Sequence, residues 1–230
     1  DPSFVSQNSQ RIHTFRKVFK RWLKKEKITP SPEKKLLDIG CAGGAFLKVA
    51  NDLDFQVVGV EPSSYLCDFG QKKYNLDLRP GILQDQRFND NEFDIISMWD
   101  VIEHLDQPGK VLEEIHRILK PDGKLIINYP EYDSWPRKLL GYKWPFFLSV
   151  HLYYFTPKTM CHLLKNYGFR TKHCEPYLQT LELGYVLKRA GQIYTPFKWV
   201  ERVIKSIGLG RVPITYYIGQ TLVTAVKRDM

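Results

Sequence analysis

Strand-like apolar runs alternate with segments of helical periodicity in the first half of the chain. The runs that predict buried strands lie at 35–39, 56–60, 76–79, 93–98 and 125–129. Between them, apolar side chains recur every three or four residues, which predicts helices at 45–53, 63–73 and 108–119. Strands that alternate with helices predict a parallel sheet covered on both faces. We therefore expect an α/β fold whose ligand site lies at the carboxyl ends of the strands.

The second half departs from this repeat in two segments. Residues 130–157 are rich in aromatic side chains and follow the fifth predicted strand, on the ligand side. Residues 176–217 contain two predicted helices between the last two predicted strands. These four elements lie at 170–175, 181–193, 196–207 and 219–227. We expect both segments to form a helical and aromatic cap within one domain, residues 1–230; the alternative places the aromatic side chains in the core.

Residues 1–30 contain the most basic part of the chain. Segment 11–27 has eight Lys or Arg residues and one Glu, so it carries +7 of the net charge of +9. Its apolar residues recur at helical spacing, and they are Ile12, Phe15, Phe19, Trp22 and Leu23. This basic amphipathic helix has three open interpretations: it docks on the domain by its apolar stripe, it lies on a membrane surface, or it presents a nucleic-acid face.

Composition agrees with a soluble globular protein. The 230 residues are 43% apolar and 26% charged, and no apolar run approaches the ~18 residues of a spanning helix. Cys41, Cys67, Cys161 and Cys174 are widely separated and show no zinc-ligand spacing. We expect reduced thiols in a cytoplasmic protein, with peripheral contact at the inner membrane face if the N-terminal helix binds lipid.

A glycine-rich loop follows the first predicted strand. Gly40, Ala42 and Gly44 form a tight turn in which the backbone can approach a ligand closely. Glu61 ends the second strand, where a carboxylate can accept both hydroxyls of a ribose. This combination predicts a nucleoside-containing cofactor. Asp38, before the loop, is unfavourable beside a pyrophosphate but suits an ammonium group, which favours S-adenosylmethionine over a dinucleotide.

These segments resemble the motifs of class I S-adenosylmethionine-dependent methyltransferases. The four matching segments, in the order of the family's motifs, are 36–44, 57–61, 93–105 and 118–125. Together they define a cofactor-binding core at 35–129, and Ala42 replaces the glycine of the commonest pattern. The resemblance implies a Rossmann-like sheet of seven strands, mostly parallel, with the last strand antiparallel.

The resemblance also implies site residues by position. Cofactor contacts are expected for Asp38, Gly40, Cys41, Ala42, Gly44, Glu61, Leu83, Gln84, Trp99 and Asp100. Within this set Glu61 holds the ribose hydroxyls, and Leu83 and Gln84 contact adenine. Trp99 and Asp100 lie between the cofactor and the acceptor. Ordinary packing is the alternative role for Leu83 and Trp99.

Two histidines are candidates for the base that accepts the acceptor's proton. Methyl transfer from a sulfonium is an in-line displacement, so the protein has to align the acceptor and provide a route for its proton. His104 is the first candidate and His151 the second, with a structural role as the alternative for each. Asp100, Glu103 and His104 also resemble a cluster in ubiquinone-pathway O-methyltransferases, some of which use a divalent ion. Because Asp reaches less far than the Glu at that cluster's first position, we predict no metal.

The segment after the fifth predicted strand indicates which class of molecule accepts the methyl group. Residues 132–169 are similar to a bacterial subgroup of these methyltransferases tied to cell-surface glycan and natural-product pathways. We predict S-adenosylmethionine-dependent methylation of a small molecule, at a hydroxyl of a sugar, a lipid-linked glycan or a natural-product intermediate. Arg137, Lys138 and Lys143 beside aromatic rings suit pairing with phosphate.

Two alternatives to this function stay open. One is a quinone-pathway aromatic O-methyltransferase, and the other is a non-catalytic binding module that keeps the cofactor fold. Nucleic acid is not an expected partner, because no Asn/Asp-Pro-Pro-aromatic tetrapeptide follows the fourth strand.

Overall fold

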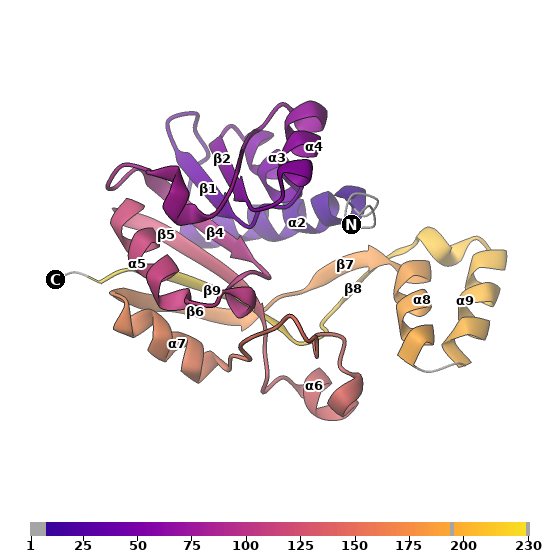
Figure 1. Ribbon diagram of the computed structural model, residues 1–230. Helices are drawn as coiled ribbons and strands as arrows, with labels where there is room; N and C mark the ends of the chain where they lie inside the picture. The colour runs from indigo at the N-terminus through magenta and orange to yellow at the C-terminus, as the bar shows by residue number, and fades with distance from the viewer. Residues whose placement is uncertain (1–7, 194–195, 229–230) are drawn as a thin grey trace.

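A twisted sheet with helices on both faces forms the body of the protein (Figure 1). The computed structural model describes residues 8–193 and 196–228, and in this part of the chain the main sheet has seven strands in the order β3-β2-β1-β4-β5-β9-β6. Their bounds are β1 Lys35–Ile39, β2 Gln56–Glu61, β3 Asp77–Pro80, β4 Phe93–Trp99, β5 Leu119–Pro130, β6 Phe169–Pro176 and β9 Gln220–Lys227. β9 is antiparallel to both of its neighbours, and the other pairs are parallel. The predicted Rossmann-like fold, including its antiparallel last strand, is confirmed.

Helices cover both faces because successive side chains of a strand point to opposite sides. Leu36 lies in the apolar cluster that contains α2 and α3 residues, and Leu37 lies in the cluster that contains α5 and α7 residues. The helices around the sheet are α2 Asn8–Glu26, α3 Ala45–Asn51, α4 Ser64–Tyr74, α5 Pro108–Ile118 and α7 Pro157–Asn166. Predicted and observed boundaries differ by a few residues, except that β5 begins at Leu119 rather than at residue 125.

The N-terminal helix α2 is part of the core. Phe15, Phe19, Trp22 and Leu23 are at most 5% exposed. The indole Nε1 of Trp22 donates a hydrogen bond of 2.8 Å to Oγ1 of Thr224 in β9. The apolar stripe of α2 therefore docks on the domain, as the first interpretation predicts, and its insertion into a membrane is incompatible with this packing.

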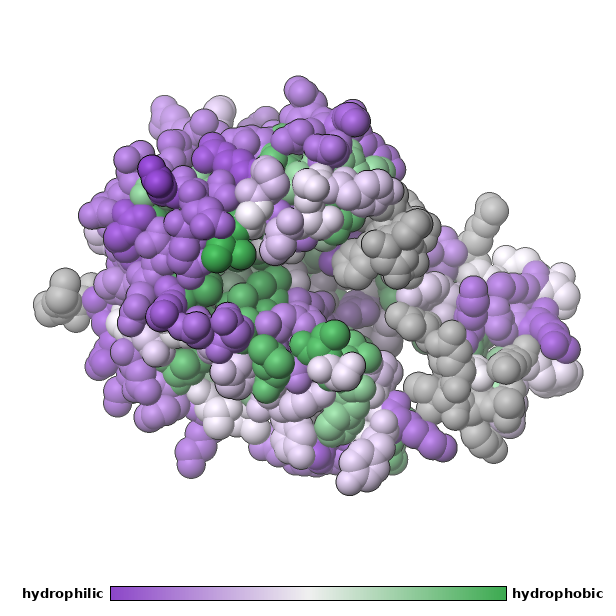
Figure 2. Space-filling model, viewed as in Figure 1, coloured by the Kyte–Doolittle hydropathy of each residue, from purple (hydrophilic) through white to green (hydrophobic). Residues whose placement is uncertain are grey.

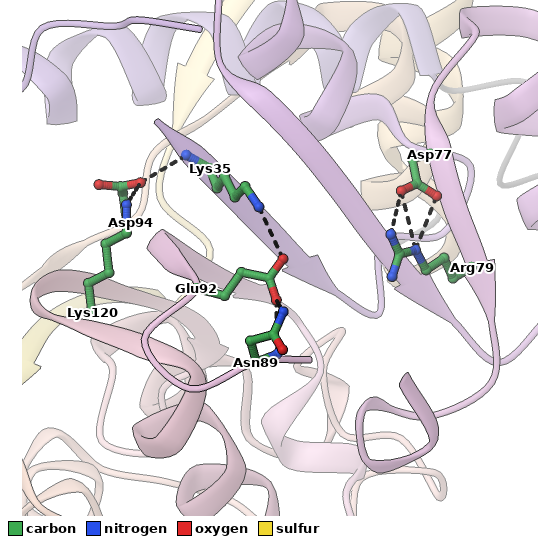
Figure 3. Close-up of polar contacts among 7 residues, drawn as sticks. All are labelled: Lys35, Asp77, Arg79, Asn89, Glu92, Asp94 and Lys120. Atoms are coloured by element: carbon green, nitrogen blue, oxygen red, sulfur yellow. Dashed lines mark hydrogen bonds and ion pairs between the residues drawn. The ribbon is translucent and has the colours of Figure 1, made fainter. Parts of the chain in front are cut away.

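Ion pairs and hydrogen bonds link the amino ends of the central strands of the sheet (Figure 3). Asp94 of β4 accepts hydrogen bonds from the backbone N–H of Lys35 at 2.9 Å and from Nζ of Lys120 at 2.8 Å. Lys35 Nζ also pairs with Glu92 at 3.2 Å. A cavity of about 460 Å³ lies on this edge, lined in part by Asp94 and Lys120. The Asp94 carboxylate is thus already paired, and the predicted site residues lie at the opposite, carboxyl edge of the sheet.

Residues 176–217 contain a projecting arm, defined here as residues 179–216. A ribbon carries two helices and one 3₁₀ turn: β7 Gln179–Glu182, α8 Leu183–Ile193, α9 Pro196–Ser206, η4 Leu209–Arg211 and β8 Pro213–Tyr216. The ribbon is fixed to α2, where Thr14 Oγ1 donates a 2.6 Å hydrogen bond to the carbonyl of Thr180. Figure 1 shows the arm extending beyond the sheet, whereas the predicted cap would lie over the sheet edge. The sequence analysis assigns no strand to either segment of the ribbon, and residues 181–182 of β7 fall within the helix predicted at 181–193.

The other segment predicted as a cap, residues 130–157, packs on the loop after β4. It contains α6 Trp135–Leu140 and η3 Gly141–Lys143. The backbone N–H groups of Leu152 and Tyr153 donate to the carbonyl of Glu103, at 2.8 and 3.2 Å.

Among the described helices, none combines the length and the apolar content that crossing a membrane requires.

Candidate active site

The glycine loop after β1 has a backbone that few side chains tolerate. Gly40, Ala42 and Gly44 all have positive φ, at 67°, 49° and 76°. A Cβ on Gly40 would lie 2.5 Å from Cγ2 of Val101, so the loop packs directly against the segment after β4. Cys41, by contrast, has its thiol in the core next to Gly59, which gives that side chain a packing role. The loop thus offers backbone rather than side chains to a ligand.

Glu61 holds its carboxylate beside this loop. It accepts hydrogen bonds from the N–H of Ala42 at 3.0 Å and from the N–H of Ser63 at 3.1 Å. The two contacts fix the carboxylate at the carboxyl end of β2, next to the loop after β1. This is the arrangement that the spacing of the two motifs predicts.

Two carboxyl groups lie at the ends of the neighbouring strands β1 and β4: Asp38 in β1 is buried, and Asp100 after β4 is half-buried. Asp38 is 2% exposed and accepts a 2.7 Å hydrogen bond from Oγ of Ser97, and burial raises its pKa to about 8. Asp100 has a φ of 55° and accepts from Nε2 of Gln220, and burial raises its pKa to about 6. The guanidinium of Arg11 in α2 lowers the pKa of both carboxyl groups. One cation from the N-terminal helix therefore acts on both acids.

Aromatic side chains surround Trp99 at the end of β4. Its ring centroid lies 5.0 Å from Phe15, 4.9 Å from Phe46 and 5.8 Å from Tyr177. Trp99 is 7% exposed, so packing accounts for most of its surface. Leu83 in η1 (Leu83–Gln86) is likewise buried at 2%, whereas its neighbour Gln84 is exposed.

The two candidate histidines, distant in sequence, meet at the carboxyl edge. Their ring centroids are 4.6 Å apart. Nδ1 of His104, in η2 (Ile102–His104), lies 2.9 Å from the carbonyl of Val150. Because a carbonyl only accepts, Nδ1 carries the hydrogen and the lone pair is on Nε2. The pKa of His151 is lowered by burial and by the neighbouring His104.

Glu103 is a buried acid close to these two histidines. It is 1% exposed, and neither carboxyl oxygen has a hydrogen-bond partner among the residues that the structure describes. Burial, with the nearby Asp100 second, raises its pKa to about 9. Burial therefore favours the neutral form of the carboxyl group.

Comparisons with known proteins agree with this geometry. A family model described as a methyltransferase domain matches residues 8–173, from α2 into β6. The chain belongs to this methyltransferase family. With its sheet order and its loop motifs, it is a class I S-adenosylmethionine-dependent methyltransferase domain.

Two curated relatives with named activities match the methyltransferase domain over less than half of its length. Phosphoethanolamine N-methyltransferase 1 of Arabidopsis thaliana is 28% identical over 109 residues, which are 45% of this chain and 22% of the relative. The ubiquinone biosynthesis O-methyltransferase of Actinobacillus pleuropneumoniae is 27% identical over 105 residues, 41% of this chain and 45% of the relative. The chain thus spans less than half of the length of either relative.

Solved structures share the fold over nearly the whole methyltransferase domain. An Archaeoglobus fulgidus S-adenosylmethionine-dependent methyltransferase has a TM-score of 0.65 at 17% identity, covering 99% of this chain and 100% of the other. A Haloferax volcanii methyltransferase, solved with the Trm112 methyltransferase activator, has a TM-score of 0.69 at 15% identity, covering 100% and 95%.

S-adenosylmethionine is the methyl donor of this class, and the methyltransferase domain fits it. A side chain at Gly40 would fill the space beside Val101, so the loop presents bare backbone there. The Glu61 carboxylate lies next to that backbone, at the end of β2, where the class would use it for the ribose hydroxyls. The individual cofactor contacts all stay predictions, for Asp38, Gly40, Cys41, Ala42, Gly44, Glu61, Leu83, Gln84, Trp99 and Asp100.

Three side chains near the acceptor side of the methyltransferase domain could also hold a divalent ion. In the described part of the chain, Glu103, His104 and His151 place one ligand atom each within 4.8 Å of the others. Asp100, the first member of the cluster noted in the sequence, is hydrogen-bonded to Gln220 and is not part of this group. A neutral Glu103 would have to lose its proton to bind an ion. The absence of a metal stays a prediction.

Sequence reasoning missed three residues of the site. Arg11, Tyr177 and Gln220 come from α2, from the end of β6 and from the start of β9, outside the four motifs. Only Arg11 has a signal in the sequence, since it lies one helical turn before Phe15 on α2. Gln220 and Tyr177 carry no such signal.

Proposed function

We propose that the domain methylates a hydroxyl of a phosphate-bearing small molecule, such as a lipid-linked glycan. When bound, S-adenosylmethionine would supply a methyl group on its sulfonium, and transfer of that methyl carbon to an acceptor oxygen would leave S-adenosylhomocysteine. The protein then has to hold the acceptor and take its proton. The observation that carries the proposal is the His104–His151 pair at the same sheet edge as the glycine loop and Glu61.

His104 is the base in this proposal. Its Nδ1 is committed to the carbonyl of Val150, so the free lone pair is on Nε2, where the proton of the acceptor would go. His104 is exposed, which leaves it accessible to an acceptor. His151 packs against the ring of His104 and holds it in position.

The test compares His104→Asn with His151→Asn. A base contributes typically 10²–10⁴-fold, so we expect His104→Asn to lower kcat by about that factor, with S-adenosylhomocysteine affinity unchanged. A positioning role predicts a smaller loss for His151→Asn. Full activity of His104→Asn at every pH would disprove the assignment of the base.

An arginine whose Nε has no hydrogen-bond partner among the described residues supports a phosphate on the acceptor. The guanidinium carbon of Arg137 lies 3.8 Å from the ring centroid of Tyr132 and 5.7 Å from that of Phe147. Its Nε is buried without a hydrogen-bond partner. Ring contacts lead from Tyr132 through Tyr154 to His151, at 5.9 Å each. An arginine stacked on this aromatic cluster suits recognition of phosphate.

Arg137→Gln tests this part of the proposal. We expect it to raise KM for a sugar phosphate or a diphosphate-linked glycan by about tenfold, the loss of one charge-assisted contact. The same variant should leave KM for the unphosphorylated sugar unchanged. Lys138→Gln is the matched control, because Lys138 lies 3.7 Å from Asp133 and is exposed. Equal effects on both acceptors would refute the phosphate contact.

The acceptor atom needs its own experiment. The aromatic cluster also accommodates a quinone-type ring, and one relative is named a ubiquinone biosynthesis O-methyltransferase. Another relative is named a phosphoethanolamine N-methyltransferase, so a phosphate-bearing amine is a second candidate. Mass spectrometry of the methylated products from a panel of sugar phosphates, catechols and phosphoethanolamine distinguishes oxygen from nitrogen. Tight cofactor binding with no product from any of them would favour the non-catalytic module.

A further inference from the structure

Exposed apolar side chains form a stripe on the outer helix of the arm. Trp199 is 68% exposed, Val203 37% and Ile207 59%. Because these residues are spaced by four, they lie on one face along α9 and its end. Val200 and Ile204, on the adjacent face of the helix, are half-buried. The helix α9 therefore has two apolar faces. One is half-buried, and the other, the stripe, faces solvent.

The arm is also strongly basic. Residues 183–212 contain six Lys or Arg residues and one Glu, which gives +5. The single acid, Glu201, is paired with Lys205 at 2.6 Å, and Arg202 is exposed. Residues 11–27 carry +7 and residues 183–212 carry +5, whereas the whole chain carries +9. The remaining residues therefore carry a net charge of −3. An apolar stripe bordered by cations on a projecting element is typical of helices that lie at the surface of an anionic membrane.

A second exposed apolar group lies on α6 and η3. Trp135 is 63% exposed, Leu139 75% and Tyr142 96%. Lys138 and Lys143 are exposed beside them. Figure 2 shows hydrophobic side chains gathered over the region of α6, on the same side of the sheet from which the arm extends in Figure 1.

We propose that the arm docks on an anionic lipid bilayer. Trp199, Val203 and Ile207 enter the headgroup boundary, while Arg202 faces lipid phosphates. The α6 segment forms a second contact on the same side. Unlike the predicted anchor, this surface uses apolar side chains that the fold leaves exposed, since the stripe of α2 is buried. The docking surface does not depend on the acceptor proposed above.

Vesicle sedimentation tests the docking surface. The full chain is mixed with vesicles of phosphatidylcholine, alone or with phosphatidylglycerol, and the bound fraction is measured. We expect binding to the anionic vesicles only. Trp199→Ser combined with Ile207→Ser should weaken it at least tenfold, and Arg202→Gln alone about fivefold.

A matched variant separates the arm from the basic N-terminal helix. Lys20→Gln combined with Lys24→Gln removes two exposed charges from α2 and should weaken binding less than the apolar arm variant does. Circular dichroism and S-adenosylhomocysteine affinity, unchanged in all variants, establish that each is folded and that the cofactor site is intact.

Three outcomes would overturn the docking surface. The first is that the wild-type chain does not sediment with anionic vesicles. The second is that the α2 variant loses binding while the apolar arm variant keeps it. The third is that the apolar arm variant converts an oligomer to a monomer in light scattering and leaves vesicle binding unchanged, which would make the stripe a contact between copies of this chain.

Discussion

At the scale of the residue, Gly40 combines two constraints that can be separated. Its φ is 67°, and a Cβ there would lie 2.5 Å from Val101 Cγ2. Gly208 is also left-handed, with a φ of 78°, but a Cβ there would meet no atom within 4 Å. Gly40→Ala and Gly208→Ala therefore both carry the left-handed cost of about 1–2 kcal/mol, and only Gly40→Ala adds the clash. Urea unfolding should show the larger loss for Gly40→Ala, together with weaker cofactor binding. Equal losses would contradict direct packing of the loop on Val101.

Glu61 provides the second test at this scale. A carboxylate that accepts ribose hydroxyls contributes about 1.5–3 kcal/mol, so Glu61→Ala should weaken S-adenosylmethionine binding roughly tenfold or more in calorimetric titration. Glu61 also accepts from the loop N–H of Ala42, and part of the loss reflects a less ordered loop. Glu113→Ala, an exposed Glu on α5, is the control. Unchanged affinity in Glu61→Ala would place the ribose elsewhere.

Glu103 gives the protein a pH-dependent stability of predictable sign. Burial raises its pKa from 4.5 to about 9, so between these values the folded state holds a proton that the unfolded state has lost. The stabilisation is complete below pH 4.5 and is lost as the pH rises towards 9, at up to about 1.4 kcal/mol per pH unit. Glu103→Gln stays neutral and should show a flatter decline in unfolding free energy from pH 6 to 9. Glu113→Gln should keep the wild-type slope, and an unchanged slope in Glu103→Gln would mean that Glu103 is ionised in the folded protein.

At the scale of the element, α2 belongs to the core rather than to a separable anchor. Phe19 is 1% exposed and contacts the rings of Trp22, Phe46 and Phe55. Phe19→Ala should cost about 3–5 kcal/mol of unfolding free energy, whereas Lys20→Ala, on the exposed face, should change it by less than about 0.5 kcal/mol. Denaturant titration distinguishes the two variants. A small loss for Phe19→Ala would mean that α2 is not firmly docked.

At the scale of the whole molecule, the arm is separable from the cofactor site. The described side chains of its helices contribute nothing to the two apolar clusters of the sheet, and the N–H of Leu183 donates to the carbonyl of Val212 where the ribbon closes. Replacing residues 183–212 by an Asn-Gly turn should therefore leave S-adenosylhomocysteine affinity unchanged and abolish vesicle binding. Calorimetry and sedimentation measure the two effects. Loss of cofactor affinity in this variant would show that the arm supports the site.

The sequence by itself determined the features that depend on residues close together along the chain. The strand and helix periodicities between residues 35 and 129 follow from which face of each element is apolar. The glycine loop and Glu61 are also local, because a parallel β-α-β unit places the ends of neighbouring strands side by side wherever it occurs. These features were enough to predict the sheet and the cofactor.

Only the tertiary structure decided which distant residues meet and which apolar faces are covered. His151 reaches His104, and Gln220 reaches Asp100, through the path of the chain after β5, which leaves no periodic signal in either segment. The basic amphipathic pattern of α2 is the same for a docked helix as for a membrane helix, and so is that of α9. Packing distinguishes them: the body of the domain covers Phe19, whereas it leaves Trp199 exposed. A hydrophobic stripe specifies that a face avoids water, and the rest of the fold determines what covers it.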